Sequence, residues 1–329
     1  MDRQQQSESG YTARVIRLLA LVTLILTPTL LPGQGPIGRG SLNKTLDKVL
    51  DAAQTQLVAT EDVWVDRTSW DTPFEVYSPN LLVQSTRSYR FTKEIAEGQQ
   101  TMLGWFRTVL GEDLEPRIMV RVRPDRDSYL AIGEEIGDEH SSFYGSFAIT
   151  SEELGTLVEA VWDPLPDWNR ETAMTVCQMQ ITHSLAQAYI KESFRNNRLP
   201  YWVEMGLCEY FTGYWRKDWL LGRLKQLRDS KRQLLFDDLQ AEDIGSFNDS
   251  NTDRRLLQLA GMFIWLLDYR EDTRIVWEDG QPKGGVFLEY LIAGLKGEDV
   301  TALPFQKVIA DPEQLAKDFD AWEIPVEGR

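Results

Sequence analysis

The pattern of apolar and polar residues changes character about half-way along the chain. In the N-terminal half, short runs rich in β-branched and aromatic residues predict strands. These runs lie at residues 74–77, 81–84, 118–122, 146–150 and 156–162. Apolar residues spaced three and four apart predict helices at residues 41–57, 89–110 and 125–136.

After Pro166 the pattern becomes almost entirely helical. Helices are predicted at residues 169–192, 201–214, 219–227, 253–269, 285–295, 303–308 and 312–322. Strands followed by helices are typical of the α+β class. We therefore expect a two-lobed α+β fold, with a mixed β-sheet and helices at residues 70–165 and a mostly helical lobe at residues 166–329. A cleft between two such lobes is where a ligand is expected.

Residues 1–33 have the pattern of an export signal. Residues 18–31 are apolar and uncharged, and Arg14 and Arg17 precede them. Because this run is short for a transmembrane helix, we expect a cleaved secretory signal, with an uncleaved N-terminal membrane anchor as the alternative. Residues 34–69 then form a linker and the first helix. The protein is expected to be exported, to the periplasm, the cell envelope or the extracellular space.

Charge narrows the range of partners. The chain of 329 residues has a formal net charge of −16, and its isoelectric point is about 4.7. An acidic surface repels phosphate backbones and anionic lipid surfaces, so nucleic acid is not an expected partner. Contact with a membrane is expected only through the N-terminal segment, if that segment is not cleaved.

The two cysteines, Cys177 and Cys208, invite a disulfide if the protein is exported. The helical periodicity argues against this bridge. Cys177 lies about 160° around its helix from Met179, away from the face that is expected to meet the second motif. Two separate buried thiols are the simpler interpretation.

Two short motifs carry the chemical signal of the sequence. The first is Met-Gln-Ile-Thr-His at residues 179–183, and the second is Leu-Pro-Tyr-Trp-Val-Glu-Met-Gly-Leu-Cys-Glu-Tyr-Phe at residues 199–211. A zinc peptidase helix carries His-Glu-x-x-His, in which two histidines one turn apart bind zinc and the glutamate is the general base. Only the last of these three positions is retained here, as His183.

The order of the motifs resembles the gluzincin, or peptidase-MA-like, superfamily. It is most similar to a branch of exported, planctomycete-type bacterial proteins whose peptidase-like domain is uncharacterised. The likeness covers roughly residues 70–322, and the second motif is its specific part. The matching segments are Phe-Glu-Val-Tyr-Ser at 74–78, Asp-Arg-Asp-Ser-Tyr at 125–129, Gly-Ser-Phe at 145–147, and the two motifs above.

The resemblance implies a degenerate metal site. The first histidine ligand of the family falls on Met179, and the catalytic glutamate falls on Gln180. The second histidine ligand is His183, and the third ligand falls on Met205. An amide cannot accept a proton at neutral pH, and a catalytic zinc needs three protein ligands. We therefore expect no catalytic residue, no cofactor and no zinc, with Met179 and Met205 together filling the former site.

Several of these residues have two interpretations. His183 is either a residual metal ligand or, as we favour, an imidazole held by hydrogen bonds. Gln180 either polarises a substrate or is a polar remnant. Glu209 is either a substitute ligand or a neighbour of the site with a structural role. Glu204 is expected on a solvated face, and His140 in a surface loop, with a contact to the cleft as its alternative.

These observations favour a pseudopeptidase that serves as a binding or scaffold module. The former substrate groove, next to the predicted edge strand at residues 147–150, is expected to take an extended peptide or protein segment by strand addition. The alternative is an active zinc-dependent metallopeptidase with a rearranged site built from His183, Glu209 and a group such as His140. A purely structural envelope protein is a third hypothesis.

Overall fold

The computed structural model describes residues 73–111, 118–136, 145–151, 155–240 and 251–325. The chain divides into two compact units, residues 1–60 and 61–329, and every described residue belongs to the second unit. The predicted export signal, the helix at 41–57 and His140 lie outside the described residues.

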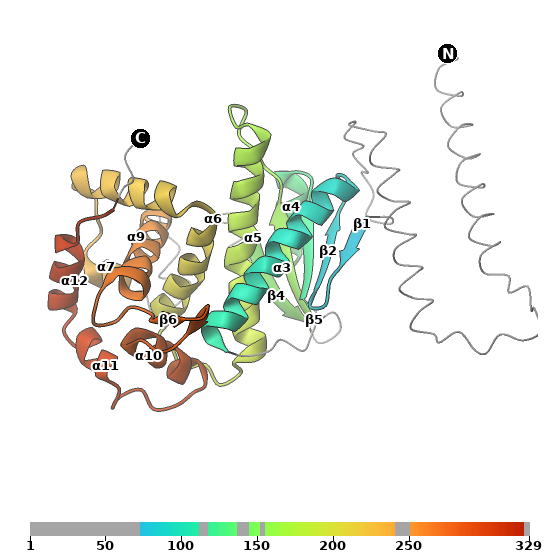
Figure 1. Ribbon diagram of the computed structural model, residues 1–329. Coiled ribbons are helices and arrows are strands. Elements are labelled where there is room, and N and C mark those ends of the chain that lie inside the picture. Colours follow the sequence, from blue (N-terminus) through green and yellow to red (C-terminus); the bar gives the residue numbers. More distant parts are fainter. Residues whose placement is uncertain (1–72, 112–117, 137–144, 152–154, 241–250, 326–329) are drawn as a thin grey trace, which may run out of the picture. The chain divides into compact units, whose positions relative to one another are not determined.

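A mixed sheet forms the first part of this unit (Figure 1). Its strands, in the spatial order β1-β2-β3-β5-β4, are β1 (Phe74–Tyr77), β2 (Leu81–Ser85), β3 (Ile118–Arg123), β5 (Gly155–Val161) and β4 (Ser146–Ser151). The three central strands are parallel, and the two outer strands run antiparallel to their neighbours. Among the described strands, β4 therefore has a partner on one side only.

Helices cover both faces of the sheet. Helix α3 (Tyr89–Leu110) and helix α5 (Arg170–Ser193) pack on one face, against the inward side chains of the central strands. Helix α4 (Arg126–Ile136) packs on the other face, where Tyr129 joins Phe147 and Val161 in a small apolar cluster. The alternation of side chains along each strand supplies both faces with apolar residues.

Local sequence sets where the two long helices begin and end. The Ser88 side chain accepts a hydrogen bond of 3.1 Å from the backbone N–H of Phe91, and Asn169 caps α5 in the same way. These are the side chains that satisfy the otherwise unpaired N–H groups of a first turn. Helix α3 ends at Gly111, whose φ of 81° lies in the left-handed region that favours glycine.

The rest of the unit is mostly helical. Its elements are α6 (Tyr201–Asp229), α7 (Phe236–Leu239), α9 (Thr252–Ile264), the π-helical turn η2 (Trp265–Tyr269), β6 (Trp277–Glu278), β7 (Gln281–Pro282), α10 (Val286–Leu295), α11 (Pro304–Ile309) and α12 (Pro312–Ala321). One hydrophobic core runs from the sheet through these helices. The two regions are therefore joined by continuous apolar packing.

The α+β class, with a mixed N-terminal sheet and a mostly helical C-terminal region, is confirmed. Helix α6 loses helical geometry at Arg216, which separates the two helices predicted at 201–214 and 219–227. The β6–β7 hairpin and α7 were not predicted, because each is only a few residues long.

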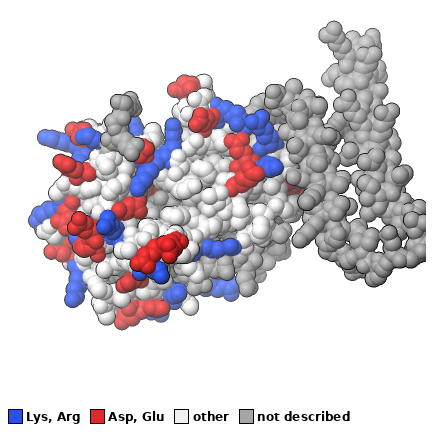
Figure 2. Space-filling model, in the orientation of Figure 1, with Lys and Arg blue, Asp and Glu red and all other residues white. Residues whose placement is uncertain are grey.

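The charged side chains are spread over the surface. Figure 2 shows acidic and basic side chains intermixed over the face that it presents. Within the described ranges, no helix is long and apolar enough to cross a membrane.

A buried ion pair holds β3 to β5 on the face that α4 covers. Arg123 contacts Glu159 through two hydrogen bonds of 2.7 and 2.8 Å, and Glu159 is 1% exposed. Removing one partner of a buried pair leaves the other charge without compensation. We expect Glu159→Ala to lower the free energy of unfolding by about 3–5 kcal/mol.

The measurement is chemical denaturation followed by circular dichroism. Glu97→Ala is the matched control, because Glu97 is an exposed glutamate whose ion pair with Lys93 measures 4.0 Å. This control should change stability by less than about 0.5 kcal/mol. Equal changes in the free energy of unfolding would show that the buried pair contributes no more to stability than the exposed one.

Candidate functional site

The first motif helps to form a small pocket of about 190 Å³ between the sheet and the helices. Met179, Gln180 and His183 of α5 line it together. Their spacing of one residue and one helical turn places them on adjoining parts of one helix surface. We call it the motif pocket, and its remaining walls are Gly145, Ser146, Glu209, Thr212, Asp253 and Leu256.

His183 and Glu209 form the central contact of the motif pocket. The Nδ1 atom of His183 lies 2.6 Å from Oε1 of Glu209, and both side chains are largely buried. The hydroxyl of Thr212, one turn further along α6, lies 3.1 Å from Oε2 of Glu209. Both carboxylate oxygens of Glu209 thus have hydrogen-bonding neighbours within the protein. The imidazole is held by a carboxylate, an arrangement that agrees with both interpretations of His183.

Gln180 closes the pocket toward the sheet. A Cβ atom added to Gly145 would lie 2.2 Å from the side-chain amide of Gln180, so this amide packs directly on the backbone before β4. The Ser146 hydroxyl donates a 2.5 Å hydrogen bond to the backbone oxygen of Gln180, and it also contacts Ser184 at 2.7 Å. The start of the edge strand is thereby fixed to α5 at Gln180.

Met179 and Met205 have different surroundings. Met179 lines the motif pocket, and Met205 is not among the described residues that line it. Met205 is 1% exposed and packs in the core, where its sulfur accepts a hydrogen bond of 3.2 Å from Nε2 of Gln187. That the two methionines together take the place of a metal ion stays a prediction, since a fully packed side chain does not line a pocket.

Glu204 is placed differently from the expectation of a solvated face. Its carboxylate accepts a 2.8 Å hydrogen bond from Nδ2 of Asn197, in the turn that precedes α6. Burial raises the pKa of Glu204, and the nearby Lys191 and Asn197 partly oppose this shift. The chain segment before α6 folds against the first turn of the helix and shields this side chain from water.

The described residues offer little to a metal ion. No group of three or more His, Cys, Asp or Glu side chains that could hold a metal occurs in the described ranges. His183 and Glu209 are close to one another, but they are joined by a hydrogen bond. His140, the third member of the alternative metal site, lies outside the described residues. The motif pocket can present an imidazole, a carboxylate, an amide and hydroxyls to a ligand.

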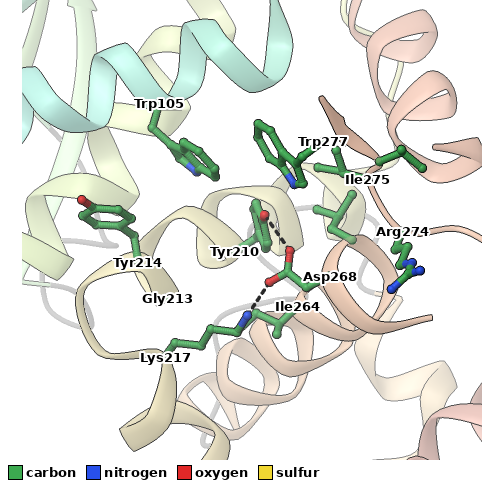
Figure 3. A pocket seen from close by; sticks show the side chains of 12 residues that line it. Trp105, Tyr210, Gly213, Tyr214, Lys217, Ile264, Asp268, Arg274, Ile275 and Trp277 are labelled. Carbon is green, nitrogen blue, oxygen red and sulfur yellow. Dashed lines mark hydrogen bonds and ion pairs between the residues drawn. The ribbon is translucent and has the colours of Figure 1, made fainter. Parts of the chain in front are cut away.

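A larger pocket lies apart from the motifs, and sequence reasoning missed most of it. It encloses about 620 Å³, and Trp105, Tyr214 and Trp277 contribute aromatic walls (Figure 3). The signal that could have found Trp277 is Asp279-Gly280, which favours a tight hairpin turn.

The comparisons with known proteins leave the chain without an assigned family. No protein-family model matches the sequence, and the search of curated proteins finds no match either.

The two cysteines are separate buried thiols. Burial raises the pKa of Cys177 to about 12, an effect that the nearby Arg87 partly opposes. Burial also raises the pKa of Cys208 well above its usual value. Since the thiolate is the reactive form, we expect neither thiol of the native protein to react with Ellman's reagent at pH 8. Both should react once guanidinium unfolds the chain. Rapid reaction of either thiol before unfolding would contradict this placement.

The side chains of the described residues predict poor zinc retention, since no group of three potential ligands occurs among them. The untagged chain, purified without chelator, offered zinc and then dialysed, should retain far less than one zinc ion per chain, because a stable site needs three or four protein ligands. Elemental analysis measures the metal content, and His183→Ala is the control. One zinc ion per chain that His183→Ala abolishes would show that replacement ligands exist.

Proposed function

We propose that this chain is a non-catalytic binding module, a pseudopeptidase with a two-lobed, zincin-like fold. Its ligand would be an extended polypeptide segment that lies along the outer edge of β4 and places one side chain in the motif pocket. One observation carries this proposal. The same pocket joins the degenerate motif to Gly145 and Ser146, where the edge strand begins, and the position of the base holds an amide.

The chemistry of the pocket supports binding over hydrolysis. Gln180 cannot accept a proton at neutral pH, and Met179 offers a thioether that suits soft metals better than zinc. The Glu209 carboxylate, the obvious substitute base, is already hydrogen-bonded to His183. The remaining groups can orient and bind a polar ligand, but none stands in for the metal-bound water of a zinc peptidase.

The register of β4 determines which main-chain groups meet the ligand. The backbone N–H of Val161 donates to the oxygen of Gly145, and Gly145 precedes a strand that pairs antiparallel with β5. Hydrogen-bonded and non-hydrogen-bonded pairs alternate along such a ladder. The main-chain groups of Ser146, Ala148 and Thr150 therefore point away from β5. These are the groups that a further strand would use.

The charges of the motif pocket suggest which side chain it prefers. Glu209 and Asp253 contribute two carboxylates, and His183 is the only basic side chain among the described residues that line the pocket. A pocket of about 190 Å³ has room for a single side chain. A basic or neutral polar side chain would meet complementary charge there, and the net charge of −16 repels acidic peptides.

The proposal places the protein outside the cytoplasm, in the periplasm or the extracellular space. This location is supported by the basic residues and the apolar run of residues 1–33, which have the pattern of an export signal. An uncleaved N-terminal anchor remains the alternative, and it would be the only part to meet a membrane.

One observation keeps an active zinc-dependent metallopeptidase as the second candidate. Zinc-binding histidines commonly donate their second ring nitrogen to a carboxylate, and His183 has this relation to Glu209. The zinc measurement described above separates the two candidates, because only the metallopeptidase requires a retained metal ion.

Strand addition predicts a specific effect of proline in β4. Ala148→Pro removes a main-chain N–H that points away from β5, so the sheet itself should tolerate the change. The probes are fluorescein-labelled decapeptides that differ at one central position, which holds Lys, Arg, Asp or Leu. We expect the proline variant to bind them at least about tenfold more weakly than the original chain does. Ala148→Ser, which keeps the N–H, should bind within about twofold of the original chain.

The measurement is fluorescence polarisation, with circular dichroism to establish that both variants fold. Peptides with Lys or Arg should bind more tightly than those with Asp. Equal binding by the proline and serine variants would exclude strand addition. Failure of the original chain to bind any of these peptides would exclude the peptide-binding module.

A further inference from the structure

The 620 Å³ pocket combines aromatic faces with a fixed set of polar groups, and we call it the aromatic pocket. It lies where α3, α6, η2 and the segment before β6 meet (Figure 3). Its volume falls in the range of about 300–1,000 Å³ that is typical of small-molecule sites. It shares no lining residue with the motif pocket.

Aromatic side chains form one side of this pocket. The rings of Trp105 and Trp277 stack with centroids 5.1 Å apart, and Tyr214 lies 6.5 Å from Trp105. Tyr214 is 55% exposed and Trp277 is 37% exposed, so both present apolar surface to water. Burial of such surface by a ligand is favourable, at about 25 cal/mol per Å².

Asp268 anchors the polar side of the pocket. Its Oδ1 accepts a 3.0 Å hydrogen bond from the hydroxyl of Tyr210, and its Oδ2 contacts Nζ of Lys217 at 2.6 Å. Figure 3 shows this group below the aromatic rings. Burial lowers the pKa of Lys217, but Asp268 outweighs that effect, so the pKa lies above its usual value. The pocket therefore holds a charged acceptor and a charged donor in fixed positions.

Two irregular elements position these groups. Asp268 lies in η2, a π-helical turn, and such turns are rare and frequently occur at functional sites. Trp277 begins a hairpin whose turn residues, Asp279 and Gly280, both have positive φ angles. Two consecutive positive φ angles are the signature of a type I′ turn. The hairpin holds the Trp277 ring against Trp105 of the sheet region.

We propose that the aromatic pocket binds a saccharide. A sugar ring has an apolar face of C–H groups, which carry partial positive charge and pack on the negative face of an indole or phenol ring. Its edges carry hydroxyls, and each hydroxyl both donates and accepts hydrogen bonds. Asp268 provides the acceptor and Lys217 the donor that such hydroxyls require.

Charge favours a saccharide over other ligands with flat or apolar faces. Lys217 and Arg274 both line the pocket and would repel a cationic ligand of the kind that aromatic cages bind. The acidic chain repels nucleic acid. A neutral saccharide meets neither penalty.

The test is isothermal titration calorimetry with three neutral oligosaccharides, chitohexaose, cellohexaose and maltohexaose. We expect at least one of them to bind, and Trp277→Ala to weaken that binding by at least about tenfold. Trp219→Ala is the matched control, because Trp219 is an exposed tryptophan on α6, at 49%, that does not line the pocket. The affinity of the Trp219→Ala variant for the saccharide should stay within about twofold of that of the original chain.

The experiments test the two proposed sites separately. Trp277→Ala should keep its affinity for the decapeptides, and Ala148→Pro should keep its affinity for the saccharide. Absence of binding by all three saccharides would exclude the saccharide assignment. Equal weakening by Trp277→Ala and Trp219→Ala, or decapeptide binding that Trp277→Ala abolishes, would also overturn it.

Discussion

Helix α5 packs against the sheet, α3 and α6 at the same time, and this burial on several sides is the constraint on which the site depends. A polar side chain in such a helix must find its hydrogen bond inside the protein. Gln178 contacts Gln99 of α3, Ser184 contacts Ser146 of β4, and His183 contacts Glu209 of α6. The polar residues of α5 therefore tie the helix to each neighbour, and the motif pocket is the place where α5 meets the start of β4, α6 and α9.

This arrangement gives the polar side chains of the motif pocket partners within the protein. The contact between His183 and Glu209 needs no metal ion, because each side chain satisfies the other. Gln180 likewise packs on Gly145, while its backbone oxygen holds Ser146. The side chains of His183, Glu209 and Gln180 thereby stabilise the junction of α5, α6 and the edge strand.

Periodicity and capping residues predicted most of the helices and strands, since these signals are local. The helix at 89–110 has Ser88 at its start and Gly111 at its end. The shared helix face of Met179 and His183 also followed from helical spacing. Helical spacing did not predict the packing of Met205 or the shielding of Glu204 from water. Both depend on which other segments of the chain pack against α6, and local sequence does not encode that. The contact of Tyr210 with Asp268 joins residues distant in sequence, and no local pattern encodes it.

Helix α6 contributes to both pockets through two of its faces. Met205, Glu209 and Thr212 follow one another at intervals of four and three residues, as do Tyr210, Tyr214 and Lys217. Corresponding members of the two sets are five residues apart and so offset by about 140° around the helix; the first set faces α5 and the second faces Trp105 and η2. The loss of helical geometry at Arg216 allows the second half of α6 to leave the line of the first half. Asp268 holds Lys217 after this break and Tyr210 before it, and it thereby sets how the two halves of α6 meet.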